Sequence, residues 1–185
     1  MDVSKTALPE VLLIKPKKFD DIRGYFYESW NQDRYAGHGI PKDFAQDNVS
    51  LSTKGTLRGL HYQEPMAQGK LVSVLVGRVF DVAVDLRRGS PRFGSWVGVE
   101  LSGETREQLW IPEGFAHGFC VISERAEFFY KCTAPYNPET EHTIRYDDPE
   151  IGIRWPLEVP VLSEKDENAF FLADATTLPI YEGEQ

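Results

Sequence analysis

Short apolar segments recur at regular spacing between about residues 45 and 135, and this pattern constrains the fold more than any other feature. Val and Phe dominate the segments, and turn-forming residues separate them, as at 88–91, 102–104 and 112–114. A parallel α/β fold would need helices of about 10–15 residues between its strands, and the sequence shows no such pattern. The spacing therefore predicts an all-β fold, an antiparallel sandwich or barrel of the jelly-roll kind.

The clearest pair of strands lies within residues 70–86, where Gly77-Arg78 can turn one strand into the next. In the second of these strands the apolar residues share one face, and Asp81 and Asp85 share the other. Helical signals are weak, so we expect only a few short peripheral helices, one over 31–37 and one capped by Ser163. Further strands are expected at 11–14, 24–29, 95–101, 107–111, 117–122 and 126–133.

The length of 185 residues predicts a single domain over 1–185, with its core at about 45–135 and both terminal extensions packed on it. Asp and Glu number 29 against 20 Lys and Arg, and the net charge of −9 argues against nucleic acid or an anionic membrane as partner. A local basic pocket for a small anion is compatible with that charge.

Cellular location is indicated by what the sequence lacks. No apolar run approaches ~20 residues, and the N-terminal residues carry no secretory pattern. Cys120 and Cys132 form no CxxC pair, which favours two buried thiols in a reducing compartment. We therefore expect a cytoplasmic protein.

The segment from Thr56 to Gln63 carries an Arg and a His on either side of a glycine. Strict alternation would place Arg58 and His61 on opposite faces of a strand, unless a bulge at Gly59 re-aims one of them. A lone His in a strand is more often structural than catalytic, so this spacing alone is a weak signal.

Three other residues have both a structural and a chemical interpretation. Lys70 opens an apolar strand, where its amine either extends to solvent or projects into a cavity and stabilises negative charge. Tyr130 shares the apolar, inward face of its strand with Phe128 and Cys132, as a core tyrosine or as a proton donor. His117, between small residues, either packs at a tight corner or lies beside a ligand.

A metal site is not expected. Many jelly-roll proteins of the cupin type hold a metal with a His-x-His pair and a Glu. The four histidines here, His38, His61, His117 and His142, form no such pair, and Gln63 stands two residues after His61.

Taken together, these segments resemble the dTDP-4-dehydrorhamnose 3,5-epimerase family. The resemblance implies a cupin-like jelly roll without metal or cofactor, and a homodimer. It also implies inversion of C3 and C5 in a dTDP-linked 4-keto-6-deoxy sugar, a step toward dTDP-L-rhamnose. The matching segments span almost the whole chain: 21–29, 46–48, 57–63, 68–70, 80–87, 110–119, 130–133, 147–149, 151–153 and 162–166.

The resemblance assigns catalytic roles to four residues. His61 would be the base that removes a proton beside the C4 ketone, and Asp166 would hold its other ring nitrogen. Tyr130 would return a proton on the opposite face, and Lys70 would stabilise the enolate oxygen. Asp81, on the less apolar face of its strand, would support a catalytic histidine or have a structural role alone.

The resemblance also implies a binding site for the nucleotide. Arg23, Arg58 and Lys165 would bind the diphosphate, and His117 would lie close to the sugar. Phe26 and Tyr136 would pack against the thymine. Polar contacts to the base, the ribose or their neighbours would come from Glu28, Gln46, Asp47, Asn48 and Glu141.

Four alternatives stay open at this point. The nearest is a relative that inverts only C3 or only C5 for an antibiotic sugar. The others are a 3,4-ketoisomerase, a nucleotide-sugar binding module without activity, and a metal-dependent cupin oxygenase.

Overall fold

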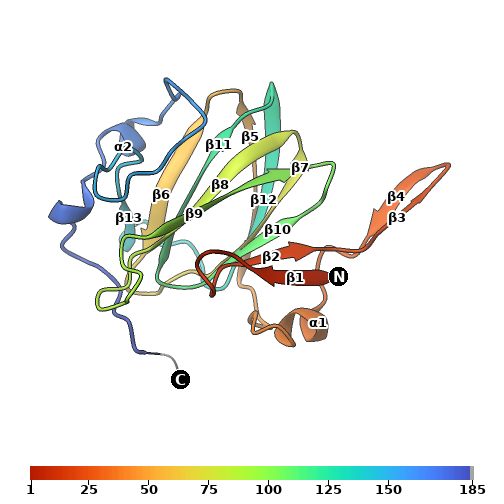
Figure 1. Ribbon diagram of the computed structural model, residues 1–185, viewed down its shortest axis with the longest axis horizontal. Coiled ribbons are helices and arrows are strands. Elements are labelled where there is room, and N and C mark those ends of the chain that lie inside the picture. The colour runs from red at the N-terminus through yellow and green to blue at the C-terminus, as the bar shows by residue number, and fades with distance from the viewer. Residues whose placement is uncertain (184–185) are drawn as a thin grey trace.

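The computed structural model describes residues 1–183 as two antiparallel β-sheets that face each other, with a separate hairpin and short helices around them (Figure 1). The six-stranded sheet has the order β1 (Asp2–Lys5), β2 (Leu12–Lys15), β10 (Gln108–Ile111), β7 (Lys70–Val76), β12 (Arg125–Cys132) and β5 (Gln46–Thr53). The five-stranded sheet has the order β13 (Glu141–Thr143), β6 (Leu57–Gln63), β11 (Phe115–Val121), β8 (Arg78–Asp85) and β9 (Trp96–Ser102). The prediction of an all-β jelly roll is confirmed.

The two predicted helix starts are also confirmed, because each has its cap. In α1 (Gln32–Ala36) the Asn31 side chain accepts a hydrogen bond from the backbone N–H of Arg34. In α2 (Glu164–Glu167) the Ser163 hydroxyl accepts one from the N–H of Asp166 at 3.2 Å. A single 3₁₀ turn, Leu172–Asp174, follows α2.

The turn at Gly77 does not form a hairpin. It passes the chain from the six-stranded sheet, where β7 lies, to the five-stranded sheet, where β8 lies. Gly77 has φ +81°, and a Cβ there would collide with the carbonyl oxygen of Arg125, so only glycine fits this crossover. Hydrophobic pattern alone could not distinguish a hairpin from a crossover, because both need a turn at the same place.

Both faces of β8 are buried, for different reasons. Val79 and Ala83 pack between the sheets with residues of β7, β10, β11 and β12. Val82 and Val84, on the other face, pack beneath the C-terminal segment, together with Ile151 and other residues. The more apolar face of this strand therefore lies outside the sandwich, and Asp81 lies on the inner face.

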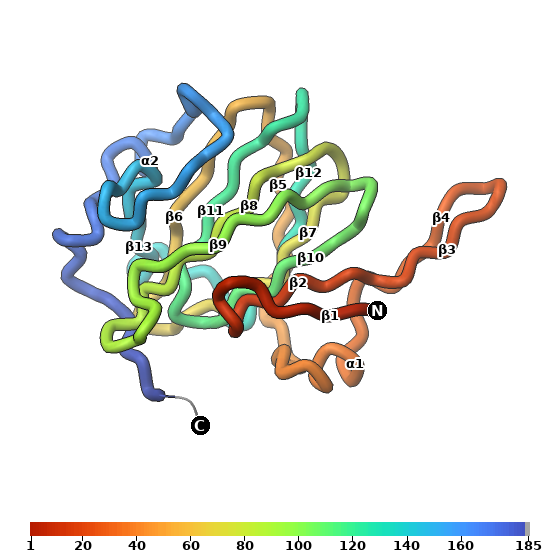
Figure 2. The backbone as a smooth tube through the Cα atoms, viewed as in Figure 1, coloured from red at the N-terminus to blue at the C-terminus, as the bar shows by residue number. Residues whose placement is uncertain are grey.

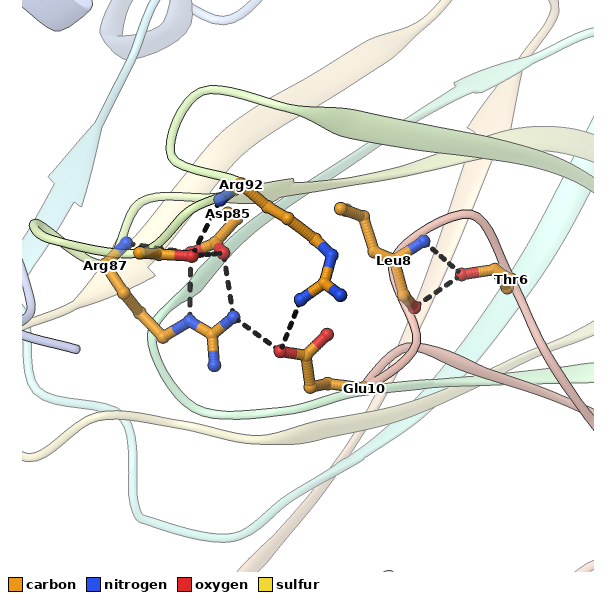
Figure 3. Close-up of polar contacts among 7 residues, drawn as sticks. Thr6, Leu8, Glu10, Asp85, Arg87 and Arg92 are labelled. Carbon is orange, nitrogen blue, oxygen red and sulfur yellow. Dashed lines mark hydrogen bonds and ion pairs between the residues drawn. The ribbon is translucent and has the colours of Figure 1, made fainter. Parts of the chain in front are cut away.

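A network of charged side chains ties the N-terminal extension to the end of β8 (Figure 3). The Arg87 guanidinium bonds to Asp85 at 2.7 Å and to Glu10 at 3.0 Å, and Arg92 approaches the same Glu10 oxygen at 3.6 Å. Ser90 donates a further hydrogen bond to the fully buried Asp85. Burial raises the pKa of Asp85, but its bonds to Arg87 and Ser90 outweigh this and hold the pKa below its usual value.

The hairpin of β3 (Lys18–Asp21) and β4 (Gly24–Tyr27) projects from the body of the molecule (Figures 1 and 2). We call residues 18–27 the arm. Phe19, Ile22, Tyr25 and Phe26 in this arm are exposed. Within residues 1–183, no helix is long and apolar enough to cross a membrane.

Candidate active site

A cavity of about 340 Å³ opens between the two sheets. The six-stranded sheet contributes side chains from β5, β7 and β12, and the five-stranded sheet contributes side chains from β6, β11 and β13. The lining residues are Gln46, Asn48, Ser50, Arg58, His61, Gln68, Lys70, His117, Phe119, Phe128, Tyr130, Cys132, Tyr136 and Glu141.

Arg58 and His61 both reach this cavity because β6 contains a bulge at Gly59, the condition under which the two side chains can share a face. His61 is opposite His117 and Arg58 is opposite Phe119, so two residues of β6 face the single Gly118 of β11. Gly59 has φ +120°, and a Cβ on it would lie 2.6 Å from the Cα of Gly118. The two glycines therefore let the strands approach closely while the bulge turns both side chains inward.

His61 forms a short hydrogen bond with Asp166, 2.6 Å from Nε2 to Oδ1. Asp166 is buried, and its second oxygen accepts a hydrogen bond from the Ser163 hydroxyl at 2.8 Å. The helix cap of α2 thus also fixes the carboxylate. With Nε2–H donating to Asp166, the lone pair of the imidazole is on Nδ1, so this nitrogen is the basic one.

The pKa values of this pair follow from their surroundings. Burial lowers the pKa of His61, and the carboxylate of Asp166 opposes that effect without cancelling it. Burial raises the pKa of Asp166, but the bonds from His61 and Ser163 more than compensate, and its pKa lies below the usual value. The pair therefore consists of a neutral imidazole and a carboxylate at neutral pH, the state that a general base needs.

Lys70 is buried in the cavity wall, with 7% of its surface exposed, so the interpretation of an amine that extends to solvent is wrong. Its Nζ lies 3.5 Å from the backbone oxygen of His61. Burial lowers the pKa of Lys70, while the acidic groups Cys132, Glu141 and Asp81 oppose that effect. A cation in this position attracts a developing oxyanion more strongly than one in water would.

Tyr130 lies on the inward face of β12, as its alternation with Phe128 and Cys132 predicts. Burial raises the pKa of Tyr130, so the phenol keeps its proton at neutral pH. Tyr130 comes from the six-stranded sheet and His61 from the five-stranded one. The phenol and the imidazole thus line the cavity from opposite sheets.

A second His–Asp pair lies deeper in the cavity. His117 Nε2 is 2.9 Å from Oδ2 of Asp81, which is fully buried. Burial raises the pKa of Asp81, with His117 and Lys70 opposing the shift. Asp81 therefore contacts a histidine of the cavity. The ring of His117 stacks against Phe128, which in turn stacks against Phe119.

Most of the predicted nucleotide contacts also gather at the cavity. Gln46, Asn48 and Arg58 line it, and so do Tyr136 and Glu141. At the rim, one oxygen of Glu141 accepts hydrogen bonds from the Tyr136 hydroxyl at 3.0 Å and from Lys165 at 2.8 Å. The bond to Glu141 holds the Lys165 amine at the rim of the cavity.

Four predicted binding residues lie outside the cavity in this chain. Arg23 and Phe26 are on the arm, where Arg23 pairs with Asp21, and Glu28 follows the arm and pairs with Arg34 at 2.7 Å. Asp47 alternates with the cavity residues of β5, so it points to the other face and pairs with Lys131 at 2.8 Å.

Sequence reasoning missed several cavity residues, among them Ser50, Gln68, Phe119 and Cys132. Ser50 could have been found, because it alternates with Gln46 and Asn48 on one strand. Cys132 and Phe119 alternate with Tyr130 and His117 in the same way, so their faces could also have been found. Gln68 precedes its strand, and no alternation indicates its position. Among residues 1–183, no three His, Cys, Asp or Glu side chains gather in a way that could hold a metal ion.

The arrangement suits proton transfer at a carbon atom beside a carbonyl group. A neutral imidazole can remove the proton, a buried ammonium can stabilise the enolate oxygen, and a phenol on the opposite wall can return a proton. Such a site inverts the carbon, because the two protons travel on opposite faces.

Comparisons with known proteins agree with this chemistry. Residues 5–174 match the family described as dTDP-4-dehydrorhamnose 3,5-epimerase. A relative of that name from Shigella flexneri is 56% identical over 177 residues, 95% of this chain and 98% of the relative. Another from Neisseria gonorrhoeae is 57% identical over 167 residues, 90% of this chain, and the match spans about half (51%) of that longer relative.

A solved structure shows the same fold. It is dTDP-6-deoxy-D-glucose-3,5-epimerase from Legionella pneumophila in complex with dTDP-4-keto-L-rhamnose, with 55% identity and a TM-score of 0.96. The alignment covers 98% of this chain and 99% of that one. The chain therefore belongs to the dTDP-4-dehydrorhamnose 3,5-epimerase family.

Proposed function

We propose that this protein is an isomerase that inverts C3 and C5 of dTDP-4-keto-6-deoxy-D-glucose and yields dTDP-4-keto-L-rhamnose. The observation that carries the proposal is the placement of His61 and Tyr130 on opposite sheets around one cavity, with Lys70 in its wall. Family membership supports the same reaction, since the Legionella relative was solved with dTDP-4-keto-L-rhamnose, the proposed product.

The mechanism uses the acidity that the C4 ketone gives to its neighbouring carbons. Nδ1 of His61 removes the proton at one of these carbons, and the C–H electron pair forms an enolate whose oxygen the Lys70 ammonium stabilises. Asp166 stabilises the resulting imidazolium. Tyr130 then transfers its phenolic proton to the opposite face of the carbon, and exchange with water restores both groups. The second carbon reacts in the same way.

The nucleotide part of the substrate would occupy the outer cavity. Arg58 supplies positive charge for the diphosphate, and Tyr136 offers an aromatic face for the thymine. Lys165 can join the diphosphate by leaving Glu141, while Glu141, Gln46 and Asn48 accept or donate hydrogen bonds to the base and ribose. His117 would lie close to the sugar.

The arm completes the site in a homodimer. Arg23 and Phe26 lie on a hairpin that projects from the body of the molecule (Figure 2) and contributes nothing to the lining of its own cavity. The exposed apolar rings of the arm favour a protein surface. In the proposed dimer they reach the cavity of the partner, where Arg23 would bind the diphosphate and Phe26 the thymine. Glu28 follows the arm and would contribute from the same side.

The proposed setting is the cytoplasm and the synthesis of dTDP-L-rhamnose. Cys120 and Cys132 are buried free thiols, which is typical of a reducing compartment. A nucleotide-linked sugar is the expected substrate there, and neither a membrane nor a nucleic acid is needed as partner.

The test is proton NMR of dTDP-4-keto-6-deoxy-D-glucose in heavy water with the purified protein. Deuterium at both C3 and C5 is the expected result. Deuterium at C3 alone or C5 alone would replace the proposal with that of a single-carbon epimerase. Tight binding without any exchange would replace it with that of a binding module.

A further inference from the structure

The turn between β9 and β10 holds an arginine in a conformation that is costly for stability. Arg106 has φ +61°, the left-handed region that side chains other than glycine rarely adopt, and only 8% of its surface is exposed. Its Nε is buried and has no hydrogen-bond partner among residues 1–183. Backbone strain and an unpaired buried donor both oppose folding, so this arrangement points to a role other than stability.

The turn that carries Arg106 is held firmly on the body of the molecule. The Ser102 hydroxyl accepts hydrogen bonds from the backbone N–H groups of Glu104 and Thr105 at 3.3 and 3.1 Å. Arg106 itself donates from its backbone N–H to Ser102 O and from Nη1 to Leu75 O at 2.8 Å. Its guanidinium group is therefore fixed relative to the two sheets.

The same guanidinium contacts the arm. It lies 4.5 Å from the ring centre of Tyr25 and 5.7 Å from that of Tyr27, and Nη2 donates to the Tyr25 hydroxyl. Both tyrosines belong to β4, and Tyr25 lies between Arg23 and Phe26 in the chain. An isolated two-stranded hairpin is barely stable in water, so its direction depends on contacts of this kind.

We propose that Arg106 is a positioning residue for substrate binding, which sets the direction of the arm and thereby presents Arg23 and Phe26 to the cavity of the partner subunit. The proposal rests on the proposed function, in which the arm completes the partner's site. Arg106 would not touch the substrate. Its removal should weaken substrate binding and leave the chemistry at His61 and Tyr130 intact.

The test uses Arg106→Gly, because glycine adopts φ +61° without strain, so the variant removes the side chain and its contacts without adding backbone strain. The expected result is a rise in KM of about tenfold with kcat changed less than about twofold, as expected for losing a cation–π contact. Arg106→Lys keeps a cation over the rings and should recover part of the loss. Size-exclusion chromatography should show the same dimer for all variants.

A double-mutant cycle with Arg23→Ala separates positioning from a general loss of stability. If Arg106 acts through the arm, the KM effects of the two substitutions should be clearly less than multiplicative, because each removes the same contribution. Fully multiplicative effects, or a fall in kcat equal to the rise in KM, would overturn the proposal. The proposal would also be overturned if Arg106→Gly left KM unchanged while Arg23→Ala raised it.

One outcome bears on the proposed function instead. If Arg23→Ala leaves KM unchanged, the arm does not bind substrate, and the role of the arm in the dimer fails together with this inference. The exchange at C3 and C5 would still be tested separately by NMR, so the two failures can be told apart.

Discussion

At the scale of single residues, the proposed mechanism depends on the protonation state of His61. Burial lowers the pKa of this imidazole, and Asp166 partly offsets the effect through a 2.6 Å hydrogen bond. The base is active when neutral, so kcat/KM should be lost only as the pH falls through a pKa below the ordinary 6.5. Neutral solutions therefore contain the active form.

Asp166→Asn tests this arrangement. The substitution removes the negative charge that raises the pKa of His61, so the acidic limb of the kcat/KM profile should move to lower pH. It also removes the group that stabilises the imidazolium, and kcat should fall about 10²–10⁴-fold. Rates measured from pH 4 to 9 check both effects.

A matched control for that experiment is Asp33→Asn, which changes an exposed carboxylate on α1. Its profile should match that of the wild type. An acidic limb that stays in place in Asp166→Asn would mean that Asp166 does not interact with the base.

The sequence predicts the position of a site residue where that position depends on neighbouring residues. It does not where the position depends on residues far away in the chain. Tyr130 could be placed facing inward, because alternation within one strand decides its face. The burial of Lys70 could not be predicted, because it depends on how the two sheets pack around the cavity. The charges of Glu141 and Asp81, which raise its pKa, also come from other strands. The 2.6 Å bond from His61 to Asp166 joins residues 105 positions apart, and only the family resemblance indicated it.

At the scale of elements, the bulge in β6 determines whether the base reaches the cavity. Gly59→Ala would place a Cβ 2.6 Å from backbone atoms of Gly118 and His117, and alanine does not favour φ +120°. The strands must separate, which moves His61. We expect kcat to fall about 100-fold or more, since small misplacements of a catalytic group have effects of that size.

The control for the bulge is Gly39→Ala. Gly39 also has a positive φ, +81°, but a Cβ there meets nothing within 4 Å. It should lose some stability and keep its kcat. Equal kcat for the two variants would show that the bulge does not position His61.

The network at the end of β8 is expected to contribute to stability. Asp85→Ala leaves the partly buried Arg87 without its main partner and should lower the free energy of unfolding by about 3 kcal/mol at pH 7. Because the pKa of Asp85 is lowered, its contribution is present above the ordinary value of 3.8 and is lost as the pH falls through the folded-state pKa. The difference from wild type should therefore shrink in strong acid.

Urea unfolding measures this difference, and Asp147→Ala is its control. Asp147 forms a more exposed pair with Arg145, worth at most about 1 kcal/mol. Equal losses in the two variants would contradict the account of the network.

Individual strands and caps were predictable, but their assignment to sheets was not. The Ser163 and Asn31 caps depend on residues within three positions of the helix start. The crossover at Gly77 and the outward apolar face of β8 depend on what packs against them: β12 in the first case and the C-terminal segment in the second. Local pattern contains no information about those partners.

At the scale of the whole molecule, the proposed dimer predicts that each cavity uses residues from two chains, because the arm projects from its own chain. A hairpin that projects from its own chain shows no local sign of its target (Figure 1). The sequence therefore predicts Arg23 as a binding residue without indicating whose cavity it would enter. Subunit mixing can decide this.

Mixing His61→Asn chains with Arg23→Ala chains should restore activity. In a mixed dimer, one cavity would have an intact His61 together with the partner's intact Arg23. After random exchange at equal concentrations, about a quarter of wild-type activity should appear at low substrate concentration. No gain over the two separate variants would mean that Arg23 serves its own chain.

The central claim is that His61 and Tyr130 act on opposite faces of the same carbon, and comparing Tyr130→Phe with His61→Asn in heavy water tests it most directly. Tyr130→Phe keeps the base and loses the opposite proton donor, so it should incorporate deuterium at C3 or C5 of the substrate without inversion. His61→Asn should incorporate none. Inverted product from Tyr130→Phe at the wild-type rate would contradict the account, because the second proton would then come from another group.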